Sequence, residues 1–295
     1  HIITTSIEHP AILGACKFLE RHGFEVTYLD VDEDGWLAPE RLREAIRDDT
    51  ILVSIMMANN EVGTILPVKE LCAIAHERDI LFHTDAVQAV GKVKVDVDDL
   101  DVDMLSLSGH KFHAPKGVGA LYVGKGVELE PLIHGGKQES GLRAGTENVP
   151  AIVGLGRAAE LALLALRDSG RMETLRDTLQ MGVRELLPNA RLNGHPESRL
   201  PNTLNLTLAG LRGESLVVAL DQHGISLSSG SACKSGSPEP THVLMAMGRT
   251  KEEAHCSVRF SLSHQTTPED IDETVAALAR VLEEMETTVR FLACK

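Results

Sequence analysis

Residues 80–124 read ILFHTDAVQAVGKVKVDVDDLDVDMLSLSGHKFHAPKGVGALYVG, and this stretch decides the fold class. Three short apolar runs within it predict buried strands: ILFHTDA (80–86), VDMLSL (102–107) and GALYVG (119–124). Asp85 ends the first run, and the segment SGHK, which contains Lys111, follows the second. Because ligands of parallel α/β sheets bind outside the carboxyl ends of the strands, we expect both side chains near one site.

The sequence before this stretch shows the same alternation. FEVTYLDV (24–31) and ILVSIMM (51–57) predict two further strands. The helices between the strands have recognisable starts at Pro10, Pro39 and Pro67. Strands that alternate with helices indicate an α/β fold with a mostly parallel sheet covered on both faces.

The pattern changes near residue 148. A long helical stretch, NVPAIVGLGRAAELALLALRD, leads into a region of mixed elements. These are helices over 173–187, 213–223 and about 268–290, with strands TLNLTL (203–208) and SVRFSL (257–262). We therefore expect a large domain over residues 1–165 and a smaller α+β C-terminal domain over residues 166–295.

Composition excludes several classes of protein. The chain has 295 residues, of which 43% are hydrophobic, so it can bury a substantial core. Its net charge of −14 argues against a surface that binds nucleic acid. The five cysteines form no CxxC pair, so they suggest neither a zinc ribbon nor a disulfide framework, and a reducing, cytoplasmic location is expected. No apolar run is long enough for a bilayer, and no signal peptide is expected.

Lys111 is the first candidate for chemistry. A lysine after a strand end can form a Schiff base with an aldehyde, such as that of pyridoxal phosphate (PLP), although SGHK alone also fits a surface turn. Asp85 makes the catalytic interpretation more specific, because a buried carboxylate can pair with a protonated pyridine nitrogen. The alternative for Asp85 is a helix N-cap. Gln88, three residues later, can hydrogen-bond a ring oxygen.

Other polar side chains near strand ends have two interpretations each. Ser108 and His110 can donate to a phosphate, and His9 can stack on a flat cofactor or simply cap a helix. Asn60 suits either a ligand contact or an ordinary turn. Thr146, in the Gly-rich segment 134–148, suits a phosphate site or a linker. The HxxH spacing of residues 110–113 has no further ligand, so no metal site is predicted.

The segment SSGSACKSGSPEP (228–240) is the second strong signal. Cys233 lies among small polar residues, where it is not a packing residue, and the neighbouring Lys234 favours the thiolate. By contrast, Cys16 and Cys72 fit amphipathic helices as buried hydrophobic residues. Arg259, in SVRFSL, suits a substrate carboxylate, with a structural salt bridge as its default role.

Seven motifs in order along the chain closely resemble those of the NifS/IscS-type cysteine desulfurases, in the class V aminotransferase family. They are TSIEHPAI, NNEVGT, HTDAVQAVGK, SLSGHKFHAPKGVGALYV, HGGKQESGLRAGTEN, SSGSACKSGSPEP and SVRFSL. The resemblance implies the PLP-dependent transferase fold type I, which is aspartate-aminotransferase-like, and a homodimer. The family also carries an N-terminal stretch with a Gly-rich turn at the PLP phosphate. This sequence begins after it, so we expect that stretch to have been removed or to come from another chain.

The resemblance implies a role for each matching residue. Lys111 would hold PLP covalently, Asp85 would pair with the pyridine nitrogen, Gln88 with the ring hydroxyl, and His9 would stack on the ring. Ser108 and His110 would bind the phosphate, Thr146 would reach the phosphate of the partner subunit, and Asn60 and Arg259 would hold the substrate carboxylate, with Asn60 also near the cofactor. Cys233 would accept the sulfur.

The implied reaction converts L-cysteine to L-alanine and leaves a persulfide on Cys233, with Lys111 as the base and His9 assisting. The acceptor of the sulfur is left open among an iron–sulfur scaffold, a tRNA-thiolation protein and a nitrogenase-specific partner, as is the use of selenocysteine. Two alternatives are another fold-type I PLP enzyme, such as an aminotransferase, and a truncated, cofactor-free interaction or scaffold piece.

Overall fold

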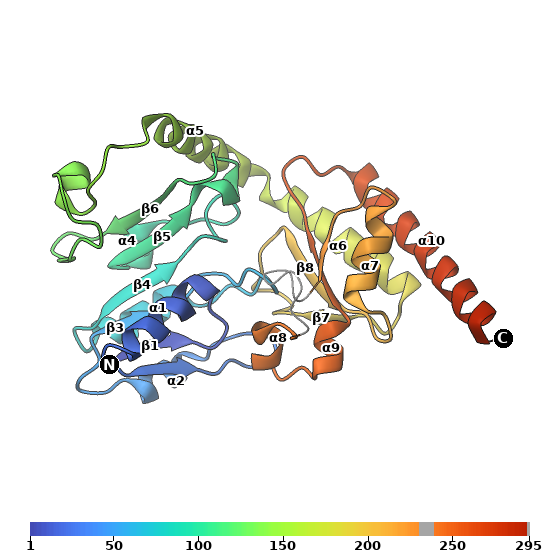
Figure 1. Cartoon of the computed structure of the whole chain (residues 1–295), viewed down its shortest axis with the longest axis horizontal. Helices are drawn as coiled ribbons and strands as arrows, with labels where there is room; N and C mark the ends of the chain where they lie inside the picture. Colours follow the sequence, from blue (N-terminus) through green and yellow to red (C-terminus); the bar gives the residue numbers. More distant parts are fainter. Residues whose placement is uncertain (230–238, 294–295) are drawn as a thin grey trace.

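The computed structural model describes residues 1–229 and 239–293, with the backbone alone described for 168–169 and 286–293. Two sheets lie side by side in it, each with its own layer of helices (Figure 1). The first sheet forms from residues before 124, and the second from residues after 190.

The large sheet has six strands in the order β2-β1-β3-β4-β5-β6. They are β1 (Ile2–Thr5), β2 (Val26–Leu29), β3 (Leu52–Ser54), β4 (Leu81–Asp85), β5 (Met104–Ser108) and β6 (Gly119–Val123). All neighbours are parallel except β5 and β6, which are antiparallel. The mostly parallel α/β sheet predicted from the sequence is therefore confirmed. β1 is an additional strand, and all four of its residues are buried.

One strand prediction is wrong in its burial. GALYVG (119–124) forms β6 as expected, but its side chains are exposed rather than buried, with Leu121 49% exposed. β6 is an edge strand, and β5 is its single neighbour among the described strands. An apolar run shows that a strand forms, but it does not show whether other elements cover it.

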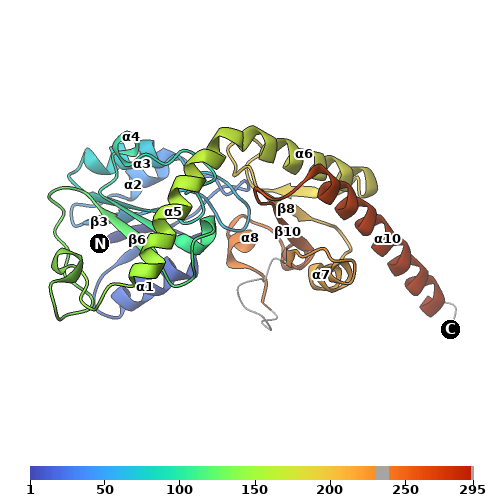
Figure 2. The same ribbon diagram turned by 90° about the horizontal axis from the view of Figure 1, so that it is seen from above.

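Helices cover the large sheet on both faces. α2 (Pro39–Ala45), α3 (Val68–His76) and α4 (Val97–Leu100) lie on one side, and α1 (Pro10–Glu20) lies on the other (Figure 2). Pro10 and Pro39 stand at the first helical position of α1 and α2, as their fixed φ favours, whereas α3 begins just after Pro67. Cys72 is fully buried in α3 and Cys16 is buried in α1, as predicted.

The second sheet is antiparallel, in the order β7-β8-β10-β9. Its strands are β7 (Arg191–Asn193), β8 (Thr203–Thr207), β9 (Ser228–Ser229) and β10 (Ser257–Ser261). Three helices pack with it around a second core: α6 (Ser169–Leu186), α7 (Gly213–Asp221) and α10 (Pro268–Ala293). α5 (Val149–Ala165) leads from the large sheet toward α6 (Figure 1).

The C-terminal half also contributes to the first core. α8 (His242–Ala246) and α9 (Lys251–His255) place Val243, Leu244 and Ala254 in the cluster formed by the large sheet and its helices. The division at residue 165 stays a prediction, because these residues lie after it in the chain but pack in the core of the large sheet. Among the described residues no single helix is long and apolar enough to span a membrane; α5 and Gly170–Leu186 meet that test of length and composition only as a pair bent by 74°.

A buried polar network joins the two sheets. Asn193 is fully buried, and its amide nitrogen donates to Asn205 Oδ1 at 2.9 Å and Thr207 Oγ1 at 2.8 Å. Its Oδ1 accepts from Arg249 Nε at 3.0 Å. Asn205 in turn donates to the backbone oxygen of Glu61, which follows β3 in the large sheet, at 3.0 Å.

Replacing Asn193 with Ala should destabilise the fold by about 3 kcal/mol, because several buried donors and acceptors lose their partners. Urea unfolding measures the change. Arg191→Ala is the matched control on the same strand, since the ion pairs of Arg191 with Glu33 and Glu253 are exposed and should cost less than about 1 kcal/mol. Equal losses in the two variants would contradict the importance of the buried network.

Candidate active site

The carboxyl ends of the parallel strands bring most of the predicted site residues together. His9 follows β1, Asn60 follows β3, Asp85 ends β4 and Lys111 follows β5. Because β1, β3, β4 and β5 are parallel neighbours, these ends lie along one edge of the sheet. Asp85 and Lys111 are close enough for their charges to act on the pKa of His9.

Asp85 is a buried carboxylate, 8% exposed. Its Oδ1 accepts the backbone N–H of Val87 at 2.9 Å in the turn that follows β4; the alternative of a helix N-cap is not found, because the next helix begins at Val97. Burial raises its pKa, while the Val87 hydrogen bond and the charge of His9 act in the opposite direction. No ion pair to Asp85 exists among the described residues. The group therefore suits a cationic partner that approaches Oδ2 from the strand end.

His9 combines both roles considered for it. It is the N-cap of α1, and its Nδ1 accepts the backbone N–H of Ala11 at 3.1 Å. Burial lowers the pKa of His9; Asp85 raises it, and Lys111 and His242 lower it. Because Nδ1 is an acceptor, the neutral ring carries its proton on Nε2.

Lys111 lies exposed in the short 3₁₀ helix η1 (Gly109–Phe112), directly after β5. Gly109 permits close packing there, since a Cβ atom at that position would lie 2.9 Å from both Ala114 Cβ and Leu155 Cδ1. Ser108 and His110 face each other, with 2.8 Å between Oγ and Nδ1. Both polar atoms therefore stand next to Lys111, where a phosphate-binding pair is expected.

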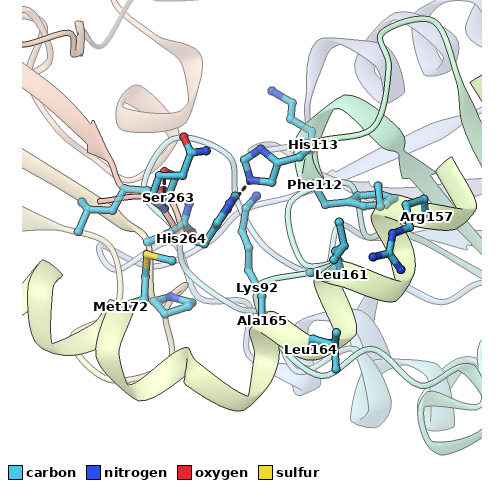
Figure 3. Close-up of a pocket in the computed structure, with 18 of the residues that line it drawn as sticks. Lys92, Phe112, His113, Arg157, Leu161, Leu164, Ala165, Met172, Ser263 and His264 are labelled. Carbon is cyan, nitrogen blue, oxygen red and sulfur yellow. Dashed lines mark hydrogen bonds between the residues drawn. The ribbon is translucent and has the colours of Figure 1, made fainter. Parts of the chain in front are cut away.

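A cavity of about 820 Å³ borders this lysine. Lys111 and Lys92 line it, together with apolar residues of α5 such as Leu161 and Leu164 (Figure 3). His113, which follows η1, is hydrogen-bonded to His264 at 3.1 Å on its wall. Asp85 and His9 are not among the lining residues, so the cavity and the charged strand ends meet at Lys111.

Arg259 and Asn60 are brought into contact from the two sheets. Arg259 Nη1 donates to the backbone oxygen of Asn60 at 2.8 Å, and its Nη2 donates to Ser228 Oγ at 3.2 Å. Its Nε and the Oδ1 of Asn60 are buried without a partner among the described residues. The default of a structural salt bridge is not found for Arg259 in this part of the chain. Unsatisfied buried groups of this kind suit a polar ligand.

The remaining predicted residues have different outcomes. Gln88 lies half-buried in the turn after β4, and its Oε1 accepts from Lys92 Nζ at 2.8 Å. Thr146 is exposed, and its side chain makes no hydrogen bond within the described residues. Cys233 lies outside the described residues. The described residues contain no group of three or more metal-binding side chains.

Sequence reasoning missed two acidic groups beside the predicted residues. Glu8 is 1% exposed; its Oε1 accepts from Thr5 Oγ1 at 2.8 Å and from Met56 N at 2.9 Å, and its Oε2 has no partner in the described chain. Glu61 accepts from Thr241 Oγ1 at 2.5 Å. In the sequence, the sign that these two residues belong to the site was their position next to His9 and Asn60, which follow strands.

Comparison with known proteins shows the family of the chain. The Aminotransferase class-V family matches residues 1–274. A cysteine desulfurase IscS of Methanosarcina thermophila is 54% identical over 286 residues, which are 97% of this chain and 70% of the relative. The chain is a cysteine desulfurase of the class V aminotransferase family.

Two similar solved structures support the fold. A NifS-like protein superimposes with a TM-score of 0.89 at 43% identity, covering 96% of this chain and 74% of the other. A structure titled "SspA in complex with cysteine" has a TM-score of 0.74 at 41% identity, covering 89% and 73%. The predicted fold class, an α/β fold of PLP-dependent transferase type I, is therefore confirmed.

The residues of the site fit the PLP on which enzymes of the class V family depend. Asp85 offers a buried carboxylate without an ion pair among the described side chains, as a pyridinium nitrogen requires. Lys111 is exposed beside it, and the Ser108–His110 pair is available for a phosphate. We infer the fit from these donors and acceptors alone.

The stability of the desulfurase should fall as pH rises from about 4.5 to about 8, through Glu8. Burial raises the pKa of Glu8 to about 8, so between these values the folded chain binds a proton that the unfolded chain has lost. This contribution is complete below pH 4.5 and is lost as pH approaches 8, at up to about 1.4 kcal/mol per pH unit.

Urea unfolding at pH 5, 6, 7 and 8 tests this dependence. Glu8→Gln keeps the shape of the neutral acid and should remove the part of the slope that Glu8 contributes. Glu77→Gln is the control, because Glu77 is exposed and Arg43 lowers its pKa, which places its titration below this range. Parallel stability curves for wild type and Glu8→Gln would show that Glu8 is ionised in the folded chain.

Proposed function

We propose that this chain uses PLP to convert L-cysteine to L-alanine and passes the sulfur to Cys233 as a persulfide. The observation that carries the proposal is that Asp85, a buried carboxylate, and Lys111, an exposed lysine, lie at adjacent strand ends. The charges of both act on the pKa of His9. The relative named as a cysteine desulfurase and the neighbour titled as a complex with cysteine support L-cysteine as the substrate.

The strand ends supply the groups that would hold the cofactor. Asp85 would face the pyridine nitrogen, Gln88 the ring hydroxyl and His9 the ring face, while Ser108 and His110 would bind the phosphate. Bound PLP supplies an electron sink that stabilises negative charge at the Cα atom of an amino acid. Asn60, through its amide NH₂ group, and Arg259 would hold the substrate carboxylate, and the buried Nε of Arg259, which has no partner among the described residues, supports this role.

Two side chains have distinct parts in moving protons. Lys111 Nζ is exposed at the end of β5 and would take the proton from the substrate Cα. His9 would act as a donor through Nε2, because its Nδ1 accepts the Ala11 N–H. Burial lowers the pKa of His9 and favours the neutral ring, which can lie flat against an aromatic ligand.

The sulfur step is balanced without an outside oxidant. The Cys233 thiolate attacks the substrate sulfur; a sulfur–sulfur bond forms as the carbon–sulfur bond breaks, and the electron pair and a proton end on the β-carbon of alanine. Described residues before and after Cys233 in the chain support this role. Ser228 Oγ accepts a hydrogen bond from Arg259, and His242 donates to the backbone oxygen of Glu8, the residue before His9.

The proposal extends to assembly and sulfur delivery. The chain would act as a homodimer, in which Thr146 serves the phosphate of the partner subunit. Exposed apolar side chains support a partner there: Leu132 is 93% exposed before Thr146, and Val153 is 66% exposed after it. A cytoplasmic iron–sulfur scaffold or another sulfur-acceptor protein would then take the persulfide sulfur.

Replacing Cys233 with Ala should abolish sulfide release, to below about 1% of wild type, while leaving the visible absorption band of bound PLP intact. The reason is that Cys233 accepts sulfur but does not hold the cofactor. Sulfide assay with L-cysteine and a reductant measures the loss, and Cys294→Ala is the matched control. Unchanged sulfide output from Cys233→Ala would remove Cys233 from the mechanism.

Borohydride treatment of the PLP-loaded protein should attach a pyridoxyl group irreversibly to Lys111, because the lysine amine is joined to the cofactor aldehyde. Mass spectrometry of the peptides locates the label. Lys111→Ala should take up no label, whereas Lys116→Ala, at an exposed lysine in the next turn, should be labelled as wild type is. A wild-type chain without band or label would instead favour a cofactor-free interaction or scaffold piece.

A further inference from the structure

A second lysine, Lys92, lies beside the proposed cofactor site and has no role in the chemistry above. It ends the turn that follows β4, in which Val90 N and Val93 N donate to the oxygens of Ala86 and Ala89. Gly91 allows the chain to reverse there, with φ at +78°. The reversal places Lys92 next to Gln88, four residues earlier.

The amine of Lys92 makes two hydrogen bonds to one residue. Its Nζ donates to the side-chain Oε1 of Gln88 at 2.8 Å and to the backbone oxygen of Gln88 at 3.0 Å. An ammonium group has donors only, so it selects the oxygen of the Gln88 amide and not its nitrogen. The Gln88 amide is therefore held with its NH₂ group turned away from Lys92.

Lys92 keeps this contact in an unfavourable electrostatic setting. Burial, together with the charges of Lys111 and Arg259, lowers its pKa to about 8. The described residues give Lys92 no carboxylate partner, and its two hydrogen bonds to Gln88 are its only ones among them. A half-buried cation among other cations, bonded only to a glutamine, is costly unless the contact serves the site.

We propose that Lys92 is a positioning residue, which fixes the orientation of the Gln88 amide so that its NH₂ group donates to the ring hydroxyl of PLP. The inference rests on the proposed function, because it deepens the role given to Gln88. Gln88 alone can turn either its oxygen or its nitrogen to the ring. Lys92 removes that choice, since its donors would face those of the NH₂ group in the other orientation.

Lys92→Met tests this role, because it keeps the length and apolar stem of the side chain but removes the donors. The PLP dissociation constant, measured by equilibrium dialysis, should rise about tenfold, as expected for loss of one oriented hydrogen bond. Lys92→Arg should restore binding to within about threefold of wild type. Lys94→Met is the matched control, since Lys94 is 74% exposed and pairs with Asp96 instead.

A double-mutant cycle with Gln88→Leu separates positioning from a direct effect. If Lys92 acts through Gln88, then Lys92→Met should change PLP affinity less than about twofold in the Gln88→Leu background. The visible absorption maximum of bound PLP should also shift in the same direction in both single variants. If Lys92→Met does not fold, as judged by circular dichroism, Lys92→Leu, which also lacks donors, provides the same cycle.

Three outcomes would overturn the inference while leaving the proposed function in place. Unchanged PLP affinity in Lys92→Met would show that the Gln88 amide needs no partner. An equal factor in both backgrounds would show that Lys92 acts on the cofactor independently of Gln88. Failure of Lys92→Arg to restore affinity, with a normal fold, would show that the donors are not what matters. A wild-type chain that binds no PLP would refute the proposed function itself, and this inference with it.

Discussion

The burial of the Asp85 carboxylate is the constraint on which the rest of the site depends. A carboxylate that is 8% exposed loses much of its hydration, and the single backbone hydrogen bond from Val87 replaces only part of it. Among the described side chains, Asp85 has no ion-pair partner. An apolar residue at the end of β4 would avoid this loss of hydration. A bound cation would therefore stabilise the buried charge further, beyond the hydrogen bond from Val87 and the charge of His9.

Parallel strand ends made this part of the site predictable. Asp85 and Lys111 are 26 positions apart, yet each follows an apolar run of its own, and β4 and β5 pair in parallel. The period of the pattern predicts the strands, and the rule for parallel sheets places their ends together. Burial was harder to predict. The run that forms β6 has the composition of a central strand, but it lies at the edge of the described sheet.

Lys92 and Glu61 show why the remaining groups could not be predicted. In the sequence Lys92 is one of two lysines between two predicted strands, and nothing local separates it from the exposed Lys94. Its burial arises from the packing of α5 and the neighbouring turns around it. Glu61 contacts Thr241, which is 180 residues away. Such contacts depend on how distant segments meet, and a local pattern carries no information about that.

The seam between the two sheets uses backbone oxygens of the large sheet as well as side-chain contacts. Three side chains of the C-terminal half donate to backbone oxygens beside the strand ends: Arg259 to Asn60, His242 to Glu8 and Asn205 to Glu61. A backbone oxygen is present whatever the residue type, so sequence patterns do not reveal these acceptors. The same fact makes the seam robust. The position of Arg259 depends on the turn after β3 and not on the side chain of Asn60, so the side chain of Asn60 is left available for a ligand. The two sheets can therefore hold their relative position through backbone contacts, while the side chains at the strand ends serve the chemistry.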